Sequence, residues 1–99
     1  MAAIKDGKVI DTSMGLTPLE GLMMGSRSGD IDASAVTYMM EKLGKAPQEM
    51  ADYLNKESGV LGITGISSDM REIEAAEATG NERAILALKM YSYRIKKYI

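Results

Sequence analysis

The sequence has 99 residues, of which 45% are hydrophobic, and its 12 basic and 14 acidic residues leave a formal net charge of −2. This length predicts one small globular domain at most, and the interspersed charges argue against a nucleic-acid or membrane partner. Cysteine and histidine are absent, which excludes disulfides, a zinc site and a serine or cysteine triad within the chain. No apolar run could span a membrane and no signal peptide is recognisable, so a cytoplasmic location is expected.

A β-hairpin is predicted over residues 2–12. Two short strands, Ala-Ala-Ile-Lys and Lys-Val-Ile-Asp-Thr, flank the pair Asp6-Gly7, which tolerates the positive φ angles of a tight turn. Two strands alone are marginal in water, so this ribbon is expected to need further strands or a helix against its apolar face.

A short helix is expected after the hairpin. Thr17 can cap it, Pro18 suits its first position, and Glu20 lies three residues after the cap, as a capping box requires. Gly25 would end this helix, because glycine readily adopts the left-handed conformation. Residues 25–30 then have no periodicity and predict a loop, whose small residues allow close approach to a ligand or a neighbouring segment.

Two amphipathic helices are predicted in the middle of the chain. Asp32 can cap the first, in which apolar residues recur at intervals of three and four until Gly44. Pro47 opens the second, which is expected to end near residues 58–59 and to pack against the first. Glycines interrupt the apolar run at residues 60–63, which therefore predicts extended or loop structure.

Two further helices complete the chain. Ser68 can cap one that starts at Asp69 and runs towards Gly80, and Asn81 can cap the last, over residues 82–99. The sequence thus predicts an α/β chain that is mainly α, with one β-hairpin followed by about five helices in a single partial domain, residues 1–99. Its last helix has no terminal cap, and truncation at both ends is expected.

Arg27 is the strongest candidate for chemistry on residue type alone. A guanidinium on a loop of Gly and Ser can bind a carboxylate or phosphate through two parallel hydrogen bonds, although a solvated loop arginine is the commoner case. Residues 67–71 open a helix whose free amides favour an anion, with ordinary capping as the competing interpretation. Neither glycine cluster matches a P-loop or a dinucleotide fingerprint, so a self-contained nucleotide site is not expected.

Five segments of the chain resemble the acetate kinase family. The longest is residues 11–32, DTSMGLTPLEGLMMGSRSGDID, and the others are LNKESGVLG at 54–62, SSDMR at 67–71, GNERA at 80–84 and YRIKKYI at 93–99. The resemblance covers essentially the whole chain, which would be a minor, internal part of a family member. It implies a ribonuclease H-like domain of the actin-like ATPase superfamily, shared with sugar kinases and Hsp70, with this chain in the second of two halves.

The resemblance also implies roles for individual residues. Arg27 would be the active-site arginine that binds the acetate carboxylate or the transferring phosphoryl group, and Pro18 would line the pocket for the acetate methyl. Asp69, Met70 and Arg71 would contact the adenosine part of ATP. The implied reaction is reversible transfer of the γ-phosphoryl group of ATP to acetate, giving acetyl phosphate and ADP, with magnesium and in a homodimer.

Several parts that the family uses have no counterpart in this sequence. These are its active-site histidines, its other substrate arginine, the Asn and Glu associated with magnesium, and its phosphate-binding glycine loops. The chain alone is therefore expected to be catalytically inactive, with the metal ligands elsewhere. A propionate kinase of the same family is one alternative, and a noncatalytic helical interaction module that uses the Met-rich apolar surface is another.

Overall fold

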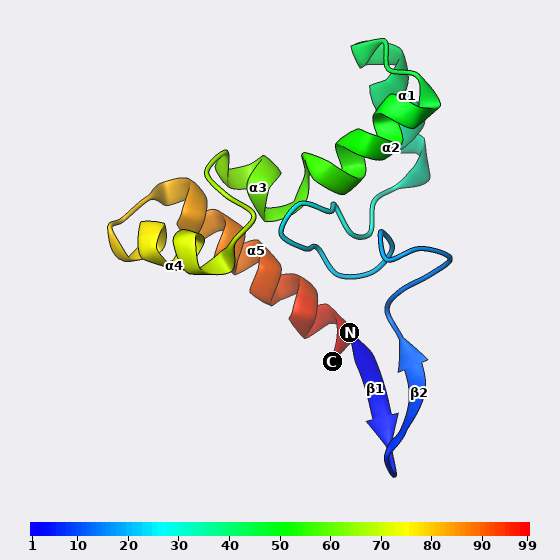
Figure 1. Cartoon of the computed structure of the whole chain (residues 1–99), viewed down its shortest axis with the longest axis vertical. Helices are drawn as coiled ribbons and strands as arrows, with labels where there is room; N and C mark the ends of the chain where they lie inside the picture. The colour runs from blue at the N-terminus through cyan, green and yellow to red at the C-terminus, as the bar shows by residue number, and fades with distance from the viewer.

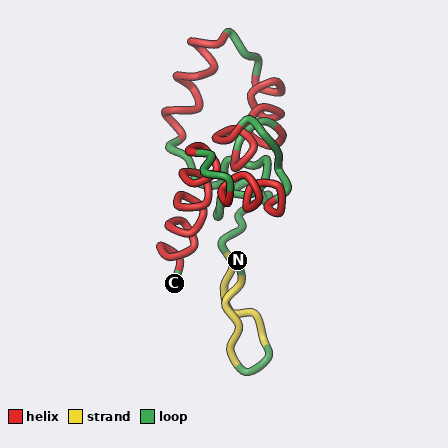
Figure 2. The backbone as a smooth tube through the Cα atoms, turned by 90° about the vertical axis from the view of Figure 1, so that its left-hand side faces the viewer, coloured by secondary structure: helices red, strands yellow, loops and turns green.

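A computed structural model describes residues 1–99 as a two-stranded hairpin followed by five helices. The hairpin projects away from the helices, and the whole molecule measures 48 × 38 × 18 Å (Figure 2). The elements in chain order are β1 Ala2–Lys5, β2 Lys8–Thr12, α1 Ala33–Leu43, α2 Pro47–Lys56, α3 Gly59–Thr64, α4 Met70–Ala78 and α5 Glu82–Tyr98. None of the five helices combines the length and the apolar character that crossing a membrane requires.

The predicted hairpin is confirmed. Its strands are antiparallel with Lys5 opposite Lys8, and both turn residues have positive φ, 52° at Asp6 and 74° at Gly7, as a two-residue hairpin turn needs. The register shifts after Ala3 and leaves Ile10 as an extra residue in β2. Every strand residue is exposed, so within this chain nothing covers the ribbon.

The core lies where α3, α4 and α5 meet, and Figure 1 shows α3 and α4 beside α5. Its buried members are Met23, Val60, Ile73, Ala84 and Ala87. The two alanines of α5 bring little side-chain volume, so the backbones of the neighbouring helices can approach closely. The helices α1 and α2 lie side by side, as predicted, and they are away from this core (Figure 1).

The helix expected from Thr17 to Gly25 is absent, and this prediction was wrong. Gly21 has a φ of 105°, which no α-helix contains. Its N–H donates to Asp30 Oδ1 over 2.8 Å, and its carbonyl accepts from the Asp30 amide over 2.9 Å. These contacts with a residue nine positions away satisfy the backbone that a helix would have paired locally, and they fold the segment into a loop.

The apolar run after Gly59 is helical, which corrects the expectation of extended or loop structure. The amides of Val60 and Leu61 donate to the carbonyls of Met24 and Gly25, over 3.0 and 2.8 Å. Free amides at the start of a helix need such partners, and here a loop distant in sequence supplies them. The Thr64 hydroxyl also donates to the Val60 carbonyl over 2.8 Å within α3.

The remaining helix caps are those predicted from the sequence, with one exception. Asp32 caps α1, Gly44 ends it with a φ of 63°, and Asn81 caps α5. At α4 the cap is Asp69, whose carboxylate accepts from the Arg71 amide, rather than the expected Ser68. A carboxylate at this position also complements the positive end of the helix dipole.

Candidate functional site

The loop that carries Arg27, residues 24–28, is fixed between α2 and α3, and we call it the arginine loop. Its backbone bonds to α2 and the turn after it through Ser28 N to Leu54 O (3.0 Å) and Ser58 N to Ser26 O (2.9 Å). Met24 N also donates to Arg27 O within the loop (3.0 Å). Together with the two bonds from α3, these contacts hold the backbone of Arg27 without requiring regular secondary structure.

Gly59 permits this close packing. It has a φ of 61°, and a Cβ atom there would lie 2.2 Å from Met24 O and 2.6 Å from Arg27 O. Both neighbours are backbone atoms, so a side chain could enter only if the arginine loop moved. The position of Arg27 therefore depends on a glycine 32 positions later.

Arg27 lines an open groove of about 520 Å³ between the arginine loop and α2. Its guanidinium forms no ion pair, since the two ion pairs of the structure are Lys56 with Asp52 and Arg71 with Asp69. The only hydrogen-bond partner of the Arg27 guanidinium is Met24 Sδ, 4.0 Å from Nη1. The guanidinium therefore keeps its strong donors for an anion such as a carboxylate or phosphate. The groove is lined by Met24, Gly25, Ser26, Arg27, Gln48, Ala51, Asp52, Asn55 and Lys56.

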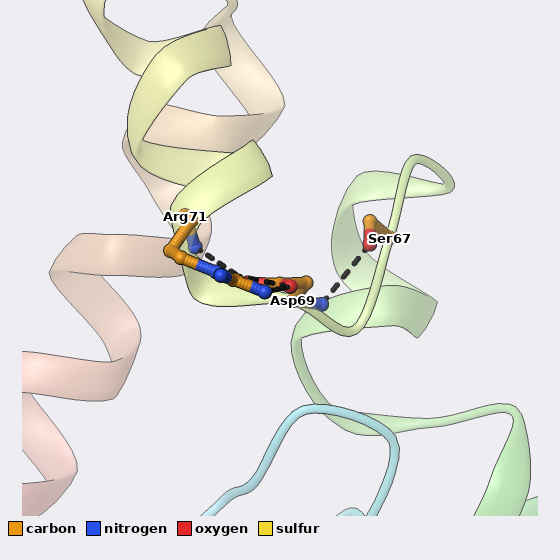
Figure 3. A network of polar contacts seen from close by, with 3 residues as sticks. All are labelled: Ser67, Asp69 and Arg71. Atoms are coloured by element: carbon orange, nitrogen blue, oxygen red, sulfur yellow. Dashed lines mark hydrogen bonds and ion pairs between the residues drawn. The ribbon is translucent and has the colours of Figure 1, made fainter.

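A second polar cluster lies at the start of α4 (Figure 3). The Arg71 guanidinium bonds both carboxylate oxygens of Asp69 over 2.6 to 3.2 Å, while the amide of Asp69 donates to Ser67 Oγ over 3.0 Å. The hydrogen bonds from the Arg71 side chain, and to a lesser extent the one from its backbone N–H, lower the pKa of the Asp69 carboxyl to about 2. The guanidinium is held in one orientation although its side chain is 88% exposed, so it presents an open planar face.

Met70 differs from its two neighbours in the predicted nucleotide segment. Its side chain is partly buried and packs against the core cluster. In this chain Met70 therefore anchors the start of α4, while Asp69 and Arg71 face outward.

The arginine loop and the Asp69 segment meet at one backbone contact. A Cβ atom on Gly25 would lie 2.5 Å from the carbonyl oxygen of Ser68, so the two backbones touch there. Pro18 lies in an exposed turn and is not among the residues that line the groove of Arg27. The structure thus brings the predicted phosphoryl and nucleotide residues into neighbouring segments and leaves Pro18 outside them.

Sequence reasoning assigned no role to the α2 residues that complete the groove, above all Lys56 and Asp52. Their spacing of four marks one face of a helix, but a solvated face has the same pattern. Only the docking of the arginine loop on α2 shows that this helix face lines a groove and is not simply a solvated face.

The side chains of this chain do not fit a metal site. No three His, Cys, Asp or Glu residues lie close enough together to hold a metal ion. The magnesium that the family resemblance implies therefore has no set of ligands here.

Comparison with known proteins places the whole chain in one family. The model of the acetokinase family matches residues 1–99. The acetate kinases of Bacteroides thetaiotaomicron and Phocaeicola vulgatus are 74% and 71% identical over 99 residues, which are 100% of this chain and 25% of each relative. The chain thus spans about a quarter of the length of these curated relatives.

Two crystal structures agree with the same assignment. The acetate kinase of Porphyromonas gingivalis matches with a TM-score of 0.92 and 59% identity, over 98% of this chain and 24% of that one. A propionate kinase from Francisella tularensis matches with a TM-score of 0.92 and 50% identity, over 98% of this chain and 25% of that one. Because the family match, the close relatives and the fold agree over essentially all residues, the chain belongs to the acetokinase family.

Proposed function

We propose that this chain is a segment of an acetate kinase, which transfers the γ-phosphoryl group of ATP to acetate. The observation that carries the proposal is the 74% identity over 99 residues to an acetate kinase. The geometry of the arginine loop supports it, since this loop holds an arginine without an ion-pair partner beside an open polar groove. By itself the chain lacks the other groups that such a site needs, and we expect it to be inactive alone.

The chemistry suits what this chain offers. Acetate is ionised at neutral pH, so its carboxylate oxygen attacks the γ-phosphorus without a general base, while the bond from phosphorus to the ADP oxygen breaks. Catalysis then depends on positioning and on neutralising charge. We assign Arg27 the role of pairing with the incoming carboxylate and the phosphoryl oxygens, whose mutual repulsion it lowers.

We assign the adenosine contact to the segment Asp69, Met70 and Arg71, in which Asp69 and Arg71 face outward and Met70 anchors the start of the helix, and the acetate methyl pocket to Pro18. The planar Arg71 guanidinium, held by Asp69, suits stacking on an adenine ring. The rest of the enzyme would complete both sites and form the homodimer. Magnesium neutralises phosphate charge in phosphoryl transfer, but the residues of this chain do not fit the ion and none of the steps assigned here depends on it.

A propionate kinase is the second candidate, favoured by the structural match to the Francisella tularensis enzyme at 50% identity. The two substrates differ by one methylene, which a hydrophobic pocket distinguishes by only about 1–3 kcal/mol. Comparing kcat/KM of the full enzyme for acetate and propionate decides between them. A higher value for propionate would overturn the acetate assignment.

The test is a hybrid enzyme in which this chain replaces the matching quarter of the Bacteroides thetaiotaomicron acetate kinase. Removal of one transition-state donor costs about 3 kcal/mol, so Arg27→Ala is expected to lower kcat at least about a hundredfold. Arg83→Ala is the matched control, because Arg83 is exposed, lies outside the groove and donates to Ile63 O over 3.3 Å. Near-normal kcat in Arg27→Ala would refute the role of Arg27.

A further inference from the structure

The groove beside Arg27 has a second cation on its opposite wall. The α2 residues that line it are Gln48, Ala51, Asp52, Asn55 and Lys56, which follow the three- and four-residue spacing of one helix face. Lys56 lies in the last turn of α2, so it is at the end of the groove where the arginine loop attaches.

The two cations are held on one connected scaffold. Ser26 Oγ donates to the carbonyl of Asn55 over 3.0 Å, and Ser28 N donates to that of Leu54 over 3.0 Å. These bonds tie the residues on both sides of Arg27 to the turn of α2 that carries Lys56. The backbones of Arg27 and Lys56 therefore keep a constant relative position around the groove.

The groove offers an anion two separate cationic groups. It contains two cations, Arg27 and Lys56, and one carboxylate, Asp52, which lies 3.0 Å from Lys56 Nζ. The side chains of this pair are 70% and 47% exposed, and such pairs contribute only about 0–1 kcal/mol. An incoming phosphate can therefore displace Asp52 at little cost. A monocarboxylate such as acetate is neutralised by one cation, whereas a phosphoryl group can use both.

We propose that Lys56 is a binding residue for the phosphate-bearing substrate, acting across the groove from Arg27. The ligand class is a phosphoanhydride or acyl phosphate, which ATP and acetyl phosphate both represent. The groove of about 520 Å³ is within the range of small-molecule sites. This inference rests on the proposed function, because it concerns the substrates of that reaction.

The test uses the same hybrid enzyme with Lys56→Ala, Lys56→Arg and the control Lys89→Ala. Lys89 lies on α5 and outside the groove. Loss of one charge-assisted contact to phosphate predicts a rise of about tenfold in KM for ATP and acetyl phosphate, with KM for acetate within about twofold of the parent value. Lys56→Arg keeps the charge and is expected to restore most of the affinity. Asp52→Asn is expected to lower the same KM values, because it frees Lys56 from its partner.

The results that would overturn the inference about Lys56 differ from the result that would overturn the proposed function. Unchanged KM values for both phosphate substrates in Lys56→Ala, or an equal rise in Lys89→Ala or for acetate, would overturn the inference while the role of Arg27 stands. If the parent hybrid phosphorylates no carboxylate, the proposed function fails instead. Lys56 is then tested by titrating the hybrid with inorganic phosphate in calorimetry. Weaker binding in Lys56→Ala than in Lys89→Ala would support the inference, and equal binding would overturn it.

Discussion

Gly59→Ala tests whether the position of the arginine loop depends on a glycine contact. The added methyl would meet the carbonyl oxygens of Met24 and Arg27 at 2.2 and 2.6 Å. These atoms belong to the backbone, so no side-chain rotation relieves the contact. The loop would have to move away from α3 and take Arg27 with it.

The size of the destabilisation follows from the backbone strain at residue 59 and from the hydrogen bonds that would break. An alanine in the left-handed region costs about 1–2 kcal/mol. Moving the loop away from α3 breaks the bonds from Val60 N to Met24 O and from Leu61 N to Gly25 O, which contribute about 1 kcal/mol each. Gly59→Ala is therefore expected to lower the free energy of unfolding by about 3–4 kcal/mol.

The matched control is Gly44→Ala. Gly44 has a φ of 63°, close to the 61° of Gly59, but nothing lies within 4 Å of a Cβ placed there. In this variant the free energy of unfolding should fall only by the cost of placing alanine in the left-handed region, about 1–2 kcal/mol. Urea unfolding followed by far-UV circular dichroism gives both values, provided that the m-values agree. Equal destabilisation in the two variants would refute the argument that the contact with the loop, rather than φ, requires a glycine.

Two further predictions concern the ends of α5. Asn81 Oδ1 accepts from the Ala84 amide over 3.0 Å, so Asn81→Ala should lower the free energy of unfolding by about 1 kcal/mol in the same urea assay; no loss would contradict this capping role. At the other end the Tyr98 hydroxyl donates to Asp30, which lowers the pKa of Asp30 and raises that of Tyr98. The carboxylate therefore adds stability that is present above its unfolded pKa and is lost as the pH falls through its folded pKa. The phenol adds stability that is present below its unfolded pKa and is lost as the pH rises through its folded pKa. Tyr98→Phe should weaken both dependences, and an NMR titration in which the pKa of Asp30 stays low in this variant would disprove the link.

The candidate site was only partly predictable from the sequence. The Gly and Ser residues around Arg27 indicated a loop arginine suited to anions, and the family resemblance assigned it a substrate, which stays a prediction. Lys56 was not found, because its place in the groove comes from bonds between the arginine loop and α2 rather than from any local pattern. Pro18 was grouped with Arg27 by resemblance, yet it does not line the same groove.

The features that local sequence predicted correctly are those whose hydrogen-bond partners are close in the chain. The hairpin turn at Asp6-Gly7 and the caps at Asp32 and Asn81 close over two to four residues, so local residue types were enough to predict them. The loop at Gly21 and the helix α3, in contrast, depend on long-range contacts. In both cases the hydrogen-bond partners lie on another segment. Asp30 is nine residues from Gly21, and the carbonyls of the arginine loop are 36 residues from Val60 and Leu61, whose amides bond to them. Local propensity contributes tenths of a kcal/mol per residue, whereas each satisfied buried amide contributes about 1 kcal/mol, so the long-range partners prevail.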